Sequence, residues 1–182
     1  NMKINYKNIQ LVAVRGDIGN QPDVDAVVNA ANPQLNIGGG VAAAIHRTAG
    51  PELYEECKPL APLSPGQAVI TGAYNLPNDY VIHCLGPVYG KDKPEAKFLA
   101  TCYKNALQLA EENKISSLAF PAISTGAYGY PFKEATKIVF DTITGELDSL
   151  KYVEKIKFVL NGEEDLKLYT EYLQELSTEA AH

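Results

Sequence analysis

Short apolar segments rich in valine and isoleucine alternate along this chain with longer segments in which apolar residues recur at helical spacing. The short segments predict strands at residues 9–14, 26–29, 67–71, 80–85, 117–120 and 155–160. The longer segments predict helices at residues 40–49, 94–113, 132–147 and 165–176. Strands that alternate with helices are typical of an α/β domain. We therefore expect a three-layer α/β/α sandwich around a central mixed, mostly parallel sheet.

The length and composition of the chain fit one globular domain. Its 182 residues are enough to bury a full core, and its 46% hydrophobic and 21% charged residues exclude disordered and collagen-like proteins. We expect a single domain over residues 2–178, with Asn1 left by an expression tag and residues 179–182 as a tail. No apolar run approaches the roughly 20 residues of a membrane span, and we expect no secretory leader.

The charged residues and the cysteines narrow the class of partner and the compartment. A net charge of −6 argues against sequence-independent binding to nucleic acid, which requires clustered Lys and Arg. Cys57, Cys84 and Cys102 are odd in number and have no C-x-x-C spacing, so we predict neither a disulfide framework nor a metal site. We expect a cytoplasmic monomer that needs no cofactor.

Two glycine-containing loops follow two of the predicted strands. The first contains Asn29, Asn32 and the run Gly38-Gly39-Gly40-Val41, and it leads directly into a helix; the second spans residues 121–131. Neither glycine loop contains Lys or Arg. Backbone N–H groups at a helix N-terminus bind phosphate without a cationic side chain, and the carboxyl ends of parallel strands meet at one edge. The loops therefore predict one cleft for a phosphorylated small molecule, although a tight turn alone also explains a glycine triplet.

Taken together, these motifs resemble the macrodomain family, which binds ADP-ribose. The resemblance covers nearly the whole chain, and it is carried by the residues 15–18, 27–32, 38–50, 83–87 and 121–131. Neither a Walker loop nor a G-x-G-x-x-G fingerprint is present, which disfavours NTPases and dehydrogenases. The resemblance implies that the partner is ADP-ribose, or a protein or metabolite that carries it.

The resemblance also implies a set of ligand-binding residues. They are Asp17, Ile18, Asn32, Gly38, Gly39, Gly40, Val41, Ser124, Thr125, Gly126, Ala127 and Tyr128. Asp17 would accept a hydrogen bond from the adenine amino group beside the N–H of Ile18, although it is also suited to cap a turn. The two glycine loops would hold the diphosphate from opposite sides, and Asn32 would contact the distal ribose.

Four further residues have a structural interpretation or mark a departure from the family. We expect Asn29 to tie loops together beneath the site, His83 to be structural and Phe132 to belong to the core. Asn161 occupies a position where relatives often place an aromatic residue near adenine, so stacking would be lost here.

A catalytic role for this chain depends on residue 42. Similar hydrolases of the family, which remove ADP-ribose from acidic side chains or deacetylate O-acetyl-ADP-ribose, usually carry an aspartate where this chain has Ala42. Other members with Gly-Gly-Gly-Val-Ala hydrolyse the same bond without that aspartate. We expect ester hydrolysis by a positioned water with Asn32, Gly40 and His46 as the catalytic residues, although His46 also fits a packing role. A non-catalytic ADP-ribose reader and an ADP-ribose 1″-phosphate phosphatase remain the alternatives.

Overall fold

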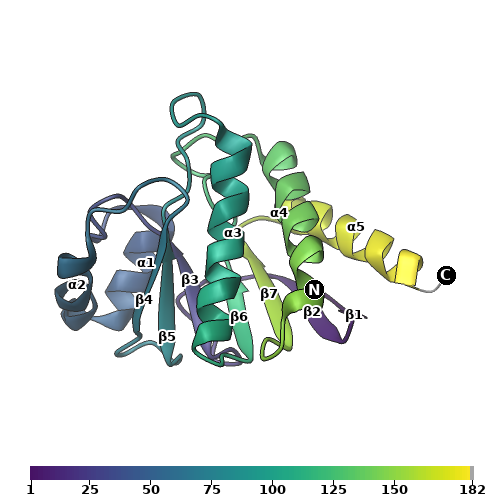
Figure 1. The fold of residues 1–182 in the computed structure, drawn as a ribbon, viewed down its shortest axis with the longest axis horizontal. Helices are drawn as coiled ribbons and strands as arrows, with labels where there is room; N and C mark the ends of the chain where they lie inside the picture. Colours follow the sequence, from purple (N-terminus) through teal and green to yellow (C-terminus); the bar gives the residue numbers. More distant parts are fainter. Residues whose placement is uncertain (181–182) are drawn as a thin grey trace.

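The computed structural model describes residues 1–180 as a seven-stranded sheet between two layers of helices (Figure 1). The strands are β1 (Met2–Tyr6), β2 (Ile9–Arg15), β3 (Ala26–Ala30), β4 (Ala68–Gly72), β5 (Tyr80–Cys84), β6 (Ser117–Phe120) and β7 (Lys155–Leu160). The helices are α1 (Gly40–Ala49), α2 (Pro51–Cys57), α3 (Glu95–Glu112), α4 (Phe132–Glu146) and α5 (Glu163–Ala180), with short 3-10 turns at Lys58–Leu60 and Leu147–Ser149.

The order of the strands across the sheet is β1-β2-β7-β6-β3-β5-β4. The five inner strands run parallel to their neighbours, whereas β1 and β4 pair antiparallel at the two edges. Parallel neighbours need a crossover between them, and the helices provide most of these connections. The expected mixed, mostly parallel sheet is therefore confirmed.

Both faces of the sheet are buried under helices. Successive side chains of a strand point to opposite faces, so Val27 packs with the residues of α1 and α2, and Val28 packs with those of α3, α4 and α5. Figure 1 shows α3 and α4 in front of the sheet and α1 behind it. This arrangement confirms the three-layer sandwich and explains why the central strands read as continuous apolar runs.

Three elements differ from the prediction. The pattern missed β1, a short edge strand that buries only Ile4 and Tyr6 and depends on its pairing with β2. It also missed α2, because Gly50-Pro51 ends α1 but Pro51 then occupies the first turn of a new helix. Helix α5 begins earlier and ends later than predicted, so residues 179 and 180 are helical, and residues 181 and 182 of the expected tail lie outside the described residues.

The connections of β3 and β6 determine where a ligand can lie. These strands are neighbours, but β3 leads to α1 on one face of the sheet and β6 leads to α4 on the opposite face. The chain therefore diverges at their carboxyl ends, and a crevice opens there.

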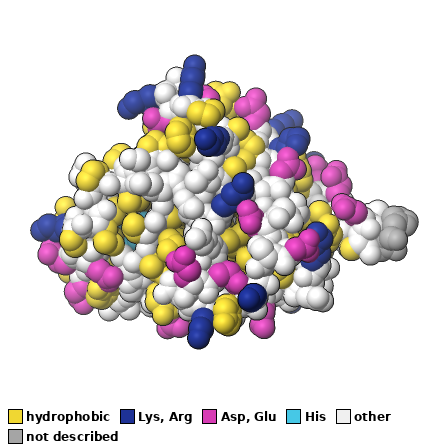
Figure 2. All heavy atoms as spheres, viewed as in Figure 1, with side chains coloured by type: hydrophobic (Ala, Val, Ile, Leu, Met, Phe, Trp, Pro, Cys, Tyr) yellow, Lys and Arg dark blue, Asp and Glu magenta, His cyan; other side chains and the backbone are white. Residues whose placement is uncertain are grey.

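The surface carries no single dominant charge on the face seen in Figure 2. Basic side chains lie among acidic ones on this face rather than in one continuous patch. No helix formed by residues 1–180 is both long enough and apolar enough to pass through a membrane.

Candidate functional site

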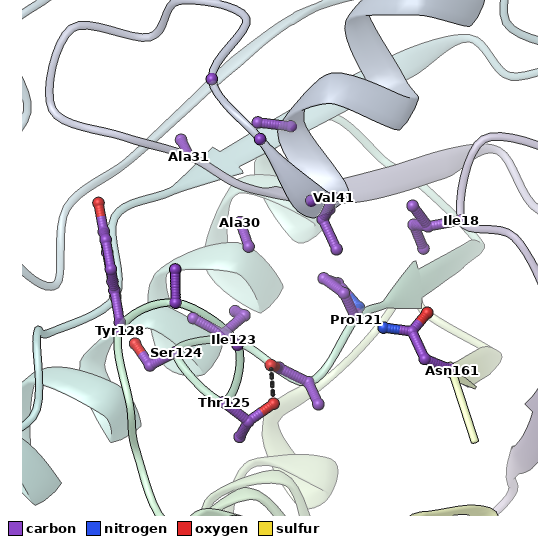
Figure 3. A pocket seen from close by; sticks show the side chains of 18 of the residues that line it. Ile18, Ala30, Ala31, Val41, Pro121, Ile123, Ser124, Thr125, Tyr128 and Asn161 are labelled. Atoms are coloured by element: carbon purple, nitrogen blue, oxygen red, sulfur yellow. Dashed lines mark hydrogen bonds between the residues drawn. The ribbon is translucent and has the colours of Figure 1, made fainter. Parts of the chain in front are cut away.

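A pocket of about 540 Å³ opens at the carboxyl ends of β3, β6 and β7. In Figure 3, Ile18 and Asn161 lie at one end of this pocket, whereas Ala31 and Tyr128 lie at the other. The predicted residues that line it are Ile18, Asn32, Gly38, Gly39, Gly40, Val41, Ser124, Thr125, Gly126, Ala127 and Tyr128. The fold thus brings both glycine loops to one cavity, as their positions after two neighbouring strands predict.

Asn32 and Gly38 shape the first loop. The Asn32 side chain bridges the backbone of Asn36, accepting from its N–H at 3.1 Å and donating to its carbonyl at 3.0 Å. Gly38 has φ +57°, and a Cβ atom there would lie 2.6 Å from Asn32 Nδ2. A larger residue at this left-handed position would displace the Asn32 side chain, so the loop favours glycine here.

Helix α1 begins at the pocket with free backbone donors. Gly39 precedes it and supplies no side-chain cap, and the first turn contains no acidic residue. The first N–H groups of the helix therefore have no internal partner, and the positive end of the helix dipole faces the cavity. This arrangement suits an anion.

The second loop is held from below by a buried tyrosine. Tyr103 of α3 donates its hydroxyl to the carbonyl of Pro121 at 3.3 Å and accepts the N–H of Ile123 at 3.4 Å. Thr125 donates to the carbonyl of Ala122 at 2.7 Å, the bond drawn in Figure 3. Ser124 has φ +68°, and its buried Oγ has no hydrogen-bond partner among residues 1–180.

The electrostatics of the pocket depend on backbone dipoles. Among the described residues that line it there is no Lys, Arg or His, and Asp165 in the first turn of α5 is the one charged side chain. Burial, followed by the neighbouring Glu164, raises the pKa of Asp165. An anionic ligand must therefore be held by N–H groups of the two loops, away from Asp165.

Asp17 does not line the pocket, although Ile18 beside it does. One carboxylate oxygen of Asp17 accepts the N–H of Gly19 at 2.8 Å, and the side chain is exposed. One oxygen of Asp17 therefore caps a turn, as its residue type also allowed, and the other oxygen stays available to a donor outside this turn.

His46 is likewise absent from the pocket lining. It is 4% exposed, and neither ring nitrogen has a hydrogen-bond partner within residues 1–180. Desolvation lowers its pKa, which favours the neutral ring. His46 lies one turn after Ala42 on the same side of α1, and Ala42 does line the cavity.

A chain of buried polar side chains connects three strands below the site. Asn29 Nδ2 of β3 donates to His83 Nδ1 of β5 at 3.0 Å, and His83 Nε2 lies 2.9 Å from the Thr71 hydroxyl of β4. Because an amide nitrogen can only donate, Nδ1 accepts and Nε2 carries the hydrogen. The structural role expected for His83 is confirmed. Asn29, however, ties adjacent strands rather than loops, since it lies opposite His83 in the sheet.

Several lining residues were missed by the sequence pattern. Gly86 and Pro121 line the pocket, as do Val159, Leu160 and Asp165. Val159 and Leu160 could have been predicted, because they end a parallel strand and ligands lie beyond such ends. Asp165 could not, because acidic residues are common in the first turn of any helix. The ring of Phe132 packs against that of Tyr169, with the ring centroids 5.9 Å apart, as expected for a core residue. Phe132 also lines the pocket.

Comparison with known proteins places the chain in a family. The model of the Macro domain matches residues 28–139. A Klebsiella pneumoniae protein named O-acetyl-ADP-ribose deacetylase is 48% identical over 170 residues, covering 91% of this chain and 97% of the relative. A macro domain-containing protein of Chlorobaculum tepidum is 45% identical over 167 residues, covering 91% of this chain and 96% of the relative.

Solved structures agree with this placement. The Oceanobacillus iheyensis macrodomain with ADP superimposes with a TM-score of 0.92 at 40% identity, covering 98% of this chain and 97% of the other. The Trypanosoma brucei macrodomain in complex with ADP-ribose has a TM-score of 0.83 at 36% identity, covering 90% of this chain and 68% of the other. The order of the glycine loops, the topology of the sheet and these matches lead to one conclusion: the chain belongs to the macro domain family.

Proposed function

We propose that this protein binds ADP-ribose and hydrolyses esters of its distal ribose, either O-acetyl-ADP-ribose or ADP-ribose attached to Asp or Glu of a protein. The observation that carries the proposal is the uncharged part of one pocket, where two loops rich in backbone N–H groups face a common space. Relatives 48% identical to the chain bear the name O-acetyl-ADP-ribose deacetylase, which supports the same chemistry.

In this proposal, the diphosphate lies between the residues 38–41 and 124–128. The N-terminal N–H groups of α1 and the backbone of the second loop act as donors to the phosphate oxygens. The adenosine occupies the end with Ile18 and Asn161, where the free carboxylate oxygen of Asp17 accepts the adenine amino group. The distal ribose then lies toward Asn32 and Tyr128, the opposite end of the pocket.

The hydrolytic step needs little from a side-chain base. A water held between the ligand's phosphate and the N–H of Gly40 attacks the ester carbonyl carbon, and the bond from this carbon to the ribose oxygen breaks. The ribose oxygen takes up a proton, and the products are a free carboxylic acid and ADP-ribose. Positioning and charge stabilisation supply the rate enhancement.

Asn32 and His46 have different parts in this scheme. Asn32 orients the distal ribose, because an amide both donates and accepts hydrogen bonds. His46, buried one turn behind Ala42, acts as a positioning residue that supports the start of α1 rather than touching the ligand. This role replaces the direct catalytic contact that the sequence pattern favoured.

A non-catalytic reader is the second candidate function, and Ala42 favours it. Ala42 lines the pocket at the position where similar hydrolases usually carry an aspartate, so this chain lacks a carboxylate there to orient a water. Hydrolysis and recognition use the same ADP-ribose contacts, and turnover alone separates them.

We also propose a reducing compartment, the cytoplasm, and a monomeric state. The thiols of Cys57, Cys84 and Cys102 are all unpaired and buried. Burial raises the pKa of Cys57 to about 11, so this thiol is poorly reactive.

A calorimetric titration with ADP-ribose tests the binding proposal. Gly39 has open space around a would-be Cβ and lines the pocket, so Gly39→Glu places a carboxylate against the diphosphate without disturbing the fold. Gly145→Glu is the matched control, because Gly145 also has open space but lies in α4 away from the pocket. We expect the parent and Gly145→Glu to bind and Gly39→Glu to lose affinity by about tenfold or more. Equal affinity in all three proteins would contradict the proposal.

A further inference from the structure

One end of the pocket is acidic. Asp165 lines the cavity at this end with Leu160 and Asn161, and Glu163 and Glu164 precede it in the first turn of α5. Figure 3 shows that Ile18, whose neighbour is Asp17, lies at the same end as Asn161. Asp165 is therefore the one carboxylate that lines the pocket, and Asp17, Glu163 and Glu164 are its acidic neighbours outside the lining.

The cation beside these carboxylates is already engaged. Arg15 at the end of β2 pairs with Glu163 at 2.8 Å and donates to the carbonyl of Asn161 at 3.3 Å. The Arg15 side chain is about half exposed and does not line the pocket. Arg15 therefore compensates the charge of Glu163. Asp165 has no salt-bridge partner among the described residues.

We propose that Asp165 is a specificity-determining residue that selects ADP-ribose with a free 2′-hydroxyl on its adenosine and rejects the 2′-phosphorylated form. This inference rests on the proposed function, which places the adenosine at this end. A carboxylate accepts hydrogen bonds from ribose hydroxyls, and phosphorylation of the 2′-hydroxyl removes that donor. A phosphate monoester carries about −1.5 to −2 charge at neutral pH and would face the carboxylate of Asp165 as a like charge.

The donors of the pocket cannot offset this repulsion. The free N–H groups belong to the two glycine loops, and in the proposed pose the diphosphate uses them. At the acidic end, the residues that line the pocket contribute an apolar surface from Ile18, Val159 and Leu160 and one neutral amide, Asn161. A third phosphate would therefore leave water for a largely apolar surface, and the nearby cation, Arg15, lies outside the pocket lining and is paired with Glu163.

Parallel titrations with two ligands test the proposal. ADP-ribose and its 2′-phosphate are titrated into the parent, into Asp165→Asn and into the control Glu164→Gln. The two variants make the same chemical change at adjacent positions, but Glu164 is exposed and does not line the pocket. We expect the parent to bind the 2′-phosphate about tenfold or more weakly than ADP-ribose. Asp165→Asn should reduce this ratio by about fivefold or more, and Glu164→Gln should leave it within about twofold.

Two outcomes would overturn the proposal. The first is a parent that binds both ligands equally well or binds the 2′-phosphate more tightly. If Arg15→Ala then loses the tighter binding of the 2′-phosphate, Arg15 is the phosphate ligand. The second is an unchanged ratio in Asp165→Asn. ADP-ribose affinity, measured in the same series, shows that each variant is folded. Failure of the parent to bind either ligand would contradict the proposed function itself.

Discussion

Gly86 and Ser124 are so close that no side chain fits between them. A Cβ atom on Gly86 would overlap the Ser124 hydroxyl, and it would also lie 2.6 Å from Cγ2 of Ile123. Gly86 follows β5 by two residues, whereas Ser124 belongs to the loop that follows β6. The missing side chain therefore lets the second glycine loop approach the sheet and adopt the left-handed conformation of Ser124.

We predict that Gly86→Ala weakens ADP-ribose binding by about tenfold and lowers the free energy of unfolding by about 1–3 kcal/mol, because the added methyl group displaces Ser124 and Ile123. Gly145→Ala is the control. Its Cβ would meet nothing within 4 Å in α4, so helix propensity should raise stability by about 0.5–1 kcal/mol and leave binding unchanged. Chemical denaturation and calorimetry measure both effects. Unchanged binding in Gly86→Ala would show that the close approach does not shape the pocket.

Tyr103→Phe should destabilise the second loop. The substitution removes both hydrogen bonds of the Tyr103 hydroxyl, whereas the N–H of Ile123 keeps its bond to the carbonyl of Pro121 at 3.1 Å. We expect a loss of about 0.5–1.5 kcal/mol in the free energy of unfolding. The ring at residue 103 keeps its contact with Phe120, with ring centroids 4.9 Å apart, so the packing of the core changes little. Tyr152→Phe, at a residue that is 43% exposed, is the matched control and should have no effect. Equal stability of the two variants would remove Tyr103 as the anchor of the loop.

Ala42→Asp separates a hydrolase from a reader. If a water positioned by Gly40 and the ligand's phosphate is sufficient, adding the carboxylate should change the turnover number by less than about tenfold, well under the 10²–10⁴ of a general base. The affinity for ADP-ribose should stay similar. A much larger gain in turnover, starting from a parent that is nearly inactive, would favour the reader.

The buried His83 makes stability depend on pH. Desolvation, together with the nearby His46, lowers the pKa of His83 to about 3, whereas an unfolded histidine titrates near 6.5. Between these values the unfolded state binds the extra proton, so stability falls as the pH drops below about 6.5. The expected loss from His83 alone is about 2 kcal/mol at pH 5. Protonation of Nδ1 would also break the bond donated by Asn29.

Denaturation at pH 7 and pH 5 checks this dependence. His83→Gln should show a smaller change in the free energy of unfolding between the two pH values than the parent. Asp23, whose pKa is lowered to about 2 through Lys155 and Lys157, responds in a more acidic range and does not confuse the comparison. A parent with equal stability at both values would contradict the buried neutral state of His83.

Most of the fold could be predicted because the hydrophobic pattern and the burial agree. The central strands are apolar on both faces, and the helices carry one apolar face each, so local periodicity was sufficient. Strand β1 and helix α2 escaped because β1 is stabilised by its neighbour β2 and α2 by packing on α1 and β4. Such contacts are invisible in a local window.

The site was predictable where backbone conformation leaves a trace in the sequence. Gly38 and Gly40 require positive φ angles that favour glycine, so the loop was evident. The sequence could not predict whether His46 and Asp165 line the pocket. A residue at a given helical position lies in a pocket or beside it, depending on how the helix is rotated against the sheet.

The most direct test of the central claim is a time course of free ADP-ribose released from a protein that carries mono-ADP-ribose on glutamate. The parent, Gly39→Glu and Gly145→Glu are compared under the same conditions. We predict release by the parent and by Gly145→Glu, and none above background by Gly39→Glu. No release by a parent that still binds ADP-ribose would contradict hydrolysis and leave a reader in its place.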